Sequence, residues 1–220
     1  KGDNFYFPYN ATITALMLIT PARFGNLYIQ ISNIITIGIE NGLPIYLPKS
    51  TESIKIPSLD GLHVKYYDGD VCDCGYLKSS FFYSDIFFSA QMKQKRQEVF
   101  AKISKFNFCR PDVDKNAIAV HIRSGDLFSG LTPNPNYSQP PISFYYHVLR
   151  KYLNYKVYLI TEDDNSPLLA PLIKWLEDLN VDFDRTGDTI EGAHEALLRS
   201  DVIISARGTF LLPILNAVDN

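Results

Sequence analysis

Cysteine, methionine and tryptophan are scarce in this sequence. Its 220 residues include three cysteines, two methionines and one tryptophan. Cys72, Cys74 and Cys109 are too few and too scattered for a disulfide framework or for a four-ligand zinc site. One disulfide that involves Cys109 and three buried thiols are both compatible with this spacing, so the disulfide state stays open.

The sequence also lacks a long hydrophobic run and a dominant sign of charge. No apolar run approaches the ~20 residues that a membrane-spanning helix needs. The 21 basic and 24 acidic residues give a net charge of −3 and are mostly interspersed. The densest basic cluster, residues 93–96, fits a solvated helix face. We therefore predict no transmembrane segment and no nucleic-acid partner.

Familiar nucleotide and metal motifs are missing. The chain contains neither GxGxxG nor GxxxxGK[ST]. None of its Asp-x-Asp triplets suggests a divalent cation bridging a diphosphate, and no set of His, Cys and carboxylate residues has metal-ligand spacing. We predict that no metal and no resident cofactor take part, and that a bound nucleotide is held by another kind of phosphate site.

The composition, 46% hydrophobic and 20% charged, is that of a globular chain long enough for one large or two small α/β domains. The chain begins at Lys1 without a signal peptide, which favours a piece of a longer protein whose targeting segment lies elsewhere. Glycosylation sequons at Asn10 and Asn136 count only weakly towards a secretory lumen, because one or two arise by chance.

Apolar periodicity predicts alternating strands and helices. In the first half we predict strand 15–20, helix 27–40, strand 43–47, strand 62–67 and helix 89–103. In the second half we predict strand 117–122, helix 142–152, strand 156–160, helix 167–179, strand 181–184, helix 191–199, strand 201–205 and helix 209–217.

This alternation predicts an α/β fold. Neighbouring parallel strands need a long crossover, which a helix supplies. A linker over residues 107–116, with Pro111 and several turn formers, divides the chain. We therefore expect two Rossmann-like domains with parallel sheets, residues 1–110 and 111–220.

Polar residues follow three strands of the second domain. They belong to the segments 121–126, 161–164 and 205–209. Because the carboxyl ends of parallel strands meet at one edge of a sheet, we expect these segments to converge.

The converging groups suit a nucleoside diphosphate. Arg123, together with backbone N–H groups of Gly208 to Phe210 at the start of a helix, would attract a diphosphate. The carboxylate of Asp163 suits the donor groups of a guanine edge or of ribose hydroxyls.

Each of these residues also has a purely structural interpretation. Arg123 and Asp126 can pair across a turn at Gly125, Asp163 and Asp164 can cap the following helix, Arg207 can lie on the surface, and His121 can be a core histidine.

The segment His121-Ile-Arg-Ser-Gly-Asp126 resembles the HxRxGD signature of GDP-fucose-dependent fucosyltransferases, particularly the α-1,2-fucosyltransferase family (glycosyltransferase family 11) with its divergent nematode-type members. Arg23-Phe-Gly-Asn26 resembles the R-L-G-N turn of that family. Residues 75–87 resemble its G-Y-x-Q-S-x-x-Y-F segment, and residues 197–215, with Thr209-Phe210, resemble its closing S-T-F block. The four motifs keep the family's order and span most of the chain.

The resemblance implies a GT-B-like fold, in which the N-terminal domain holds the acceptor and the C-terminal domain holds GDP-fucose. It implies metal-independent transfer of fucose to a glycan hydroxyl with inversion. The location implied is the Golgi or secretory lumen in a eukaryote, with a membrane anchor outside this chain, and the cytoplasm in a bacterium.

The resemblance also implies roles for individual residues. Arg123 would hold the diphosphate and stabilise the leaving GDP, and Asp126 would orient Arg123. The other implied contacts with donor or cleft are those of Asp163, Ser205, Gly208, Thr209, Phe210, Arg23, Gly25 and Asn26.

The chain departs from the family at several positions. Gly208 replaces the Ser of S-T-F, and residues 211–213 replace S-W-W. An inverting transferase also needs a base for the acceptor hydroxyl, for which Asp126, His121 and Glu162 are candidates in falling order. The departures keep two alternatives open: a transferase for another nucleotide sugar, and a non-catalytic protein that binds a glycan or a nucleotide.

Overall fold

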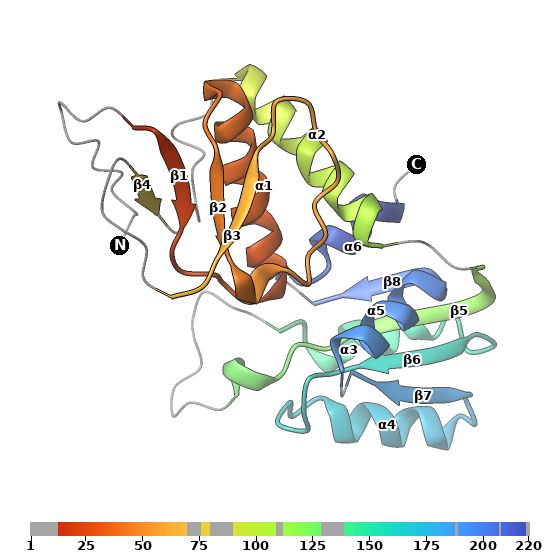
Figure 1. Cartoon of the computed structure of the whole chain (residues 1–220). Coiled ribbons are helices and arrows are strands. Elements are labelled where there is room, and N and C mark those ends of the chain that lie inside the picture. The colour runs from red at the N-terminus through yellow and green to blue at the C-terminus, as the bar shows by residue number, and fades with distance from the viewer. Residues whose placement is uncertain are drawn as a thin grey trace. The chain divides into compact units, whose positions relative to one another are not determined.

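The chain forms two compact units, residues 1–109 with 209–220 and residues 110–208 (Figure 1). The computed structural model describes residues 13–69, 76–79, 90–108, 112–128, 139–187, 189–206 and 208–218. The expectations for the three cysteines, both sequons, Arg207, most of segment 75–87 and the side chain of Asp126 lie outside the described residues.

The first unit contains a four-stranded parallel sheet. In chain order its elements are β1 (Ala15–Leu18), α1 (Phe24–Asn41), β2 (Ile45–Pro48), the 3-10 turn η1 (Lys49–Thr51), β3 (Val64–Tyr67), β4 (Tyr76–Ser79), α2 (Ala90–Asn107) and α6 (Leu212–Val218). The strand order is β3-β2-β1-β4. Strand β1 is buried along its whole length, and α1, α2 and α6 pack against one another.

Helix α1 lies close to this sheet because of a glycine. A Cβ at Gly38 would stand 2.7 Å from the end of the Ile45 side chain and 3.1 Å from the Leu43 carbonyl, so a larger residue would require the buried Ile45 side chain to shift. The helix ends at Gly42, which adopts the left-handed conformation with φ 62°. The helix thus extends beyond the predicted range 27–40 at both ends, from Phe24 to Asn41.

The second unit is a doubly wound α/β domain. Its elements are β5 (Asp114–His121), the 3-10 turn η3 (Gly125–Leu127), α3 (Ile142–Leu149), β6 (Lys156–Ile160), α4 (Leu169–Asp178), β7 (Phe183–Thr186), α5 (Ile190–Arg199) and β8 (Ser200–Ser205). All strands are parallel in the order β7-β6-β5-β8. The predicted parallel sheet of this half is confirmed.

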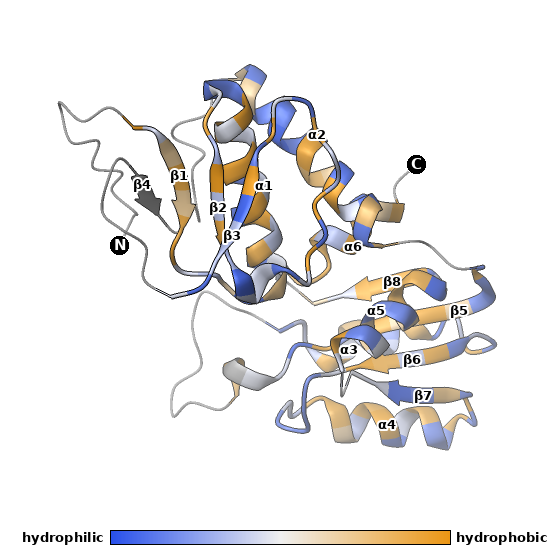
Figure 2. Cartoon of the chain, viewed as in Figure 1, coloured by the Kyte–Doolittle hydropathy of each residue, from blue (hydrophilic) through white to orange (hydrophobic). Residues whose placement is uncertain are grey.

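Apolar strands and helices form the core of the second unit (Figure 2). Ile118 and Val120 of β5 are fully buried with Tyr145 of α3 and Leu172 of α4. After β7 the chain crosses back over the sheet to β8, on the other side of β5. The crossover helix α5 therefore lies on the face opposite to α3 and α4, where Ala193 and Leu197 are buried. This sheet is the scaffold for the predicted strand-end site.

The structure corrects several boundaries. Residues 209–218 pack with the first unit, so the expected domain of residues 111–220 loses its C-terminal part. The predicted helix 209–217 begins only at Leu212. The predicted linker 107–116 is shortened, because β5 already begins at Asp114. Strand β4 lies between the predicted strand 62–67 and the predicted helix 89–103, where no strand was predicted.

Among the described residues, none of the helices combines the length and apolar character needed to span a membrane.

Candidate functional site

Three strands of the second unit end at one edge of its sheet, and the predicted polar residues Arg123, Glu162 and Ser205 follow or close these strands. Strand β5 pairs with β6 and β8, and His121 is in register with Ile160 on one side and Ser205 on the other. Beyond the strands, the N–H of Ile122 donates to the carbonyl of Ile160 (2.9 Å), and that of Ala206 donates to the carbonyl of His121 (3.1 Å). The predicted convergence is confirmed for the described residues of these segments that belong to the second unit.

Arg123 reaches from the end of β5 to the turn after β8. Its side chain is half-buried, and a Cβ placed on Gly208 would stand 3.1 Å from its Nη1 atom. The guanidinium therefore lies against the backbone at Gly208, whose φ is 158°. The glycine that departs from the S-T-F motif thus lies next to the guanidinium of Arg123.

His121 is neutral at ordinary pH. Burial, and then the positive charge of Arg123, lower its pKa from 6.5 to about 4. A base is most effective when its pKa lies near the working pH, so His121 is poorly matched to deprotonate an acceptor.

The turn after β5 is bonded to the loop after β6. The Ser124 hydroxyl accepts the N–H groups of Glu162 and Asp163, both at 3.1 Å, and lies 3.2 Å from the Thr161 hydroxyl. The N–H of Gly125 donates to the Asp163 carboxylate at 3.2 Å. Sequence reasoning missed Ser124, although it occupies a variable position inside the HxRxGD motif.

Glu162 presents its carboxylate at this turn. A Cβ on Gly125, whose φ is 58°, would overlap with the Glu162 carboxylate. The side chain of Glu162 is exposed. Glu162 is therefore the candidate base whose placement the structure favours over His121, while the side chain of Asp126 is outside the described residues.

The carboxylate of Asp163 accepts hydrogen bonds from the backbone and side chains around its own loop. Besides Gly125, it accepts the backbone N–H of Asn165 at 2.9 Å and the side-chain amide of Asn165 at 2.7 Å. Burial tends to raise the pKa of Asp163, but these hydrogen bonds outweigh it and lower the pKa overall.

The interpretation of Asp163 and Asp164 as helix caps is wrong. The N-cap of α4 is Leu168, and no side chain caps that helix. Asp164 forms an ion pair with Arg185 of β7. Ser166, just before this helix, is buried, and its hydroxyl has no hydrogen-bond partner in the part of the chain that the structure describes.

The other predicted site residues join two ends of the first unit. The Thr209 hydroxyl donates to the Asn26 side chain at 2.7 Å, and the Phe210 ring lies 5.6 Å from that of Phe24. A Cβ on Gly25 would overlap with the Thr209 carbonyl. The R-L-G-N-like and S-T-F-like motifs thus meet, and their side chains bind each other.

This arrangement corrects the expected anion site at a helix start. Because α6 begins at Leu212, the N–H groups of residues 208–210 do not belong to its first turn, and the helix has only seven residues. Among the described residues at this edge of the second sheet, Arg123 is therefore the cation that suits a diphosphate. Ser205, at the end of β8, has an exposed side chain.

The turn before α1 is fixed by a buried glutamine that sequence reasoning also missed. The Gln30 side chain accepts the N–H of Ala22 at 2.7 Å and donates to the carbonyl of Thr20 at 2.9 Å. These bonds fix the chain just before Arg23, whose side chain is exposed.

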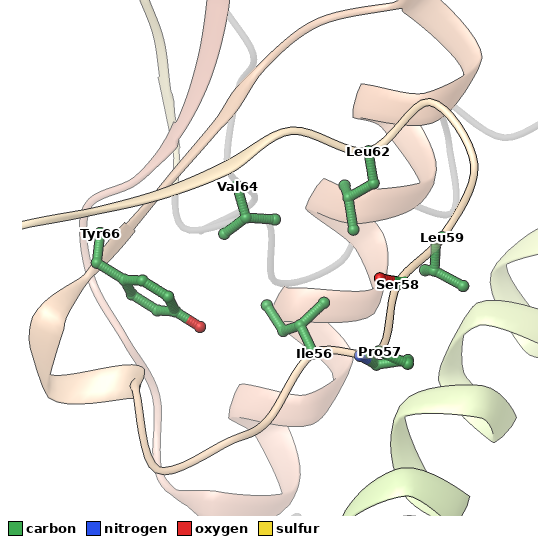
Figure 3. A pocket seen from close by; sticks show the side chains of 7 residues that line it. All are labelled: Ile56, Pro57, Ser58, Leu59, Leu62, Val64 and Tyr66. Atoms are coloured by element: carbon green, nitrogen blue, oxygen red, sulfur yellow. The ribbon is translucent and has the colours of Figure 1, made fainter.

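The first unit contains a pocket of about 240 Å³ whose lining includes none of the predicted site residues (Figure 3). Its lining consists of Ile56, Pro57, Ser58, Leu59, Leu62, Val64 and Tyr66. Burial, and then the charge of Glu52, raise the pKa of Tyr66. The lining carries no cation, so the pocket does not suit a diphosphate.

Across the described residues, no three His, Cys, Asp or Glu side chains gather where they could hold a metal ion.

Two solved structures resemble the chain over nearly its whole length. A crystal structure of POFUT1 in complex with GDP has 9% sequence identity and a TM-score of 0.51, and covers 96% of both chains. One of POFUT1 in complex with GDP-fucose has 11% identity and a TM-score of 0.53, again with 96% of both chains covered. No protein-family model matches the sequence, and no curated protein does.

These neighbours are GDP-fucose fucosyltransferases of GT-B-like fold. The predicted α/β, GT-B-like fold with parallel sheets is therefore confirmed. At this identity the similarity establishes the fold, and it does not support the α-1,2 type in particular.

Replacing Gly25 by Ala should destabilise the first unit. Ala normally favours a helix over Gly, but here its methyl group would overlap with the Thr209 carbonyl, so we expect a loss of about 1–3 kcal/mol in unfolding free energy. Urea denaturation measures it. Gly192→Ala, in the first turn of α5, meets only two threonine hydroxyls at 3.2 Å and should change stability by less than ~1 kcal/mol. Equal losses of stability in Gly25→Ala and Gly192→Ala would contradict the close approach of Gly25 to the Thr209 carbonyl.

Replacing Ser124 by Ala should destabilise the second unit by roughly 1–3 kcal/mol, because two N–H groups lose their acceptor. Thermal and urea unfolding measure the change. Ser166→Ala is a matched control, since that buried hydroxyl has no partner among the described residues and its removal should be nearly neutral. A Ser124→Ala variant as stable as Ser166→Ala would refute the bonding described.

Stability should fall as the pH drops from about 6.5 to about 4, partly through His121. In this window an unfolded His121 binds a proton that the folded one resists, so protonation favours unfolding. Between pH 7.5 and 5 the loss due to His121 should be on the order of 1–2 kcal/mol. Urea unfolding of the wild type and of His121→Asn at both pH values isolates this share, because His194 titrates alike in both proteins. Identical losses of unfolding free energy in the wild type and in His121→Asn would disprove the contribution of His121.

Proposed function

We propose that the protein is a fucosyltransferase-like glycosyltransferase that moves fucose from GDP-fucose to a hydroxyl of a glycan acceptor. The observation that carries the proposal is the position of Arg123. It lies at the carboxyl end of an inner strand of the second sheet, against the backbone of Gly208. The fold shared with GDP and GDP-fucose complexes of POFUT1 supports the same conclusion.

The chemistry of the proposed reaction explains the arginine. When the bond from the sugar to the phosphate breaks, negative charge develops on the departing GDP. A guanidinium is always charged and presents a planar set of donors that matches phosphate oxygens. Fixed in advance at the strand end, it stabilises this charge without a metal.

The finer features of the proposal rest on the sequence motifs. They are inversion at the sugar carbon, metal independence, a relation to the α-1,2 type of fucosyltransferase and a secretory location in a eukaryote. For the base we favour Glu162, whose exposed carboxylate lies against Gly125, two residues along the chain from Arg123. Asp126 keeps its proposed role of orienting Arg123. Thr209 and Phe210 act by joining the C-terminal segment to α1.

Calorimetry with GDP, GDP-fucose and UDP tests the proposal. We expect GDP to bind and Arg123→Ala to weaken it roughly 10- to 100-fold, since a hydrogen bond to a charged group contributes about 1.5–3 kcal/mol. Arg150→Ala, an exposed arginine at the end of α3, is the matched control and should leave binding unchanged. Release of GDP from GDP-fucose in the presence of a glycan array reports turnover.

Other outcomes separate the alternatives. A preference for UDP would overturn the fucose assignment and favour a transferase for another nucleotide sugar. GDP binding without turnover on any glycan would favour a non-catalytic binding protein. GDP binding that survives in Arg123→Ala would refute the role of the arginine.

A further inference from the structure

The backbone around Arg123 is held on both sides by the strand and loop of β6. On one side, the N–H of Ile122 donates to the carbonyl of Ile160 at 2.9 Å. On the other side, the Ser124 hydroxyl accepts two N–H groups from the β6 loop. Arg123 itself therefore has little freedom to shift along the edge of the sheet.

The next residue is held by Asp163. Gly125 donates its N–H to Oδ1 of Asp163 at 3.2 Å and adopts a positive φ of 58°. A glycine in this conformation has many alternatives, so a bond to a fixed acceptor decides which one the turn adopts.

Asp163 is in turn fixed within its own loop. Its Oδ1 accepts the Asn165 N–H, its Oδ2 accepts the Asn165 amide, and its carbonyl accepts the Thr161 hydroxyl at 2.5 Å. The Thr161 N–H is bonded to β7, through the carbonyl of Thr186 at 3.1 Å. A carboxylate with three donors already in place has less capacity left for the donor groups of a nucleoside.

We propose that Asp163 is a positioning residue that acts through Arg123: its carboxylate fixes the turn at Gly125 and so holds the guanidinium where it meets the diphosphate. The inference rests on the proposed function. It replaces the direct nucleoside contact that the sequence resemblance implies for Asp163. The effect of replacing Asp163 on ligand binding should therefore depend on the presence of Arg123, and not on whether the ligand carries a guanine.

The test measures binding of GDP and of inorganic pyrophosphate by calorimetry in a double-mutant cycle. The proteins are the wild type, Asp163→Ala, Arg123→Ala and the double variant. We expect Asp163→Ala to weaken both ligands by the same factor, about tenfold. In the Arg123→Ala background the same change should cost less than about twofold, because the residue through which it acts is gone.

Two further variants keep the comparison clear. Asp178→Ala removes an exposed carboxylate of α4 that pairs only with Lys174 among the described residues, and it should leave binding unchanged. If Asp163→Ala does not fold, Asn165→Ala removes one of the groups that fix the carboxylate, and a smaller loss of the same pattern is expected.

The outcomes distinguish this inference from the proposed function. Weaker GDP binding with unchanged pyrophosphate binding would show a direct nucleoside contact and overturn the positioning role. If Asp163→Ala and Asn165→Ala both bind GDP and pyrophosphate as tightly as the wild type, the positioning role is overturned and the proposed function stays intact. Failure of the wild type to bind either ligand would remove the proposed function and this inference with it.

Discussion

Strand β5 is hydrogen-bonded to parallel neighbours on both sides, and this pairing determines where the candidate site of the second unit lies. Because β6 and β8 run in the same direction, the segments that follow all three strands meet at one edge. The histidine and the arginine at the end of β5 therefore become neighbours of an acidic loop that lies almost 40 residues further along the chain. The conformation of the turn after Arg123 is fixed by hydrogen bonds from Gly125 and Ser124 to the loop that follows β6.

The first unit depends on a second close approach, between the start of α1 and the segment that leads to α6. The absence of a side chain at Gly25 lets the Thr209 carbonyl come near, and Asn26 and Phe24 then bind Thr209 and Phe210. Two motifs with a functional appearance in the sequence thus serve a structural purpose here. A motif shared with an enzyme family records what the fold requires as well as what the substrate requires.

The sequence predicted the elements of the second unit well, because its strands are continuous apolar runs and its helices have clear periodicity. It also predicted which strand ends converge. It failed where the determinant is not local. The return of residues 209–218 to the first unit depends on the close fit at Gly25, and the placement of β4 depends on its partner β1. The role of Asp163 was missed for the same reason, since its partners Gly125 and Ser124 lie almost 40 residues away in the chain.

The division of the chain into units has a consequence for its biosynthesis. The second unit, residues 110–208, lies between the two stretches that make up the first. A chain that emerges from the ribosome in order therefore exposes everything the second unit needs before the first unit receives Thr209, Phe210 and α6. Domains tend to fold as soon as they are complete. Of the two units, the first is accordingly the one that is completed last, and until then the faces of α1 and α2 that α6 covers stay exposed to chaperones and proteases.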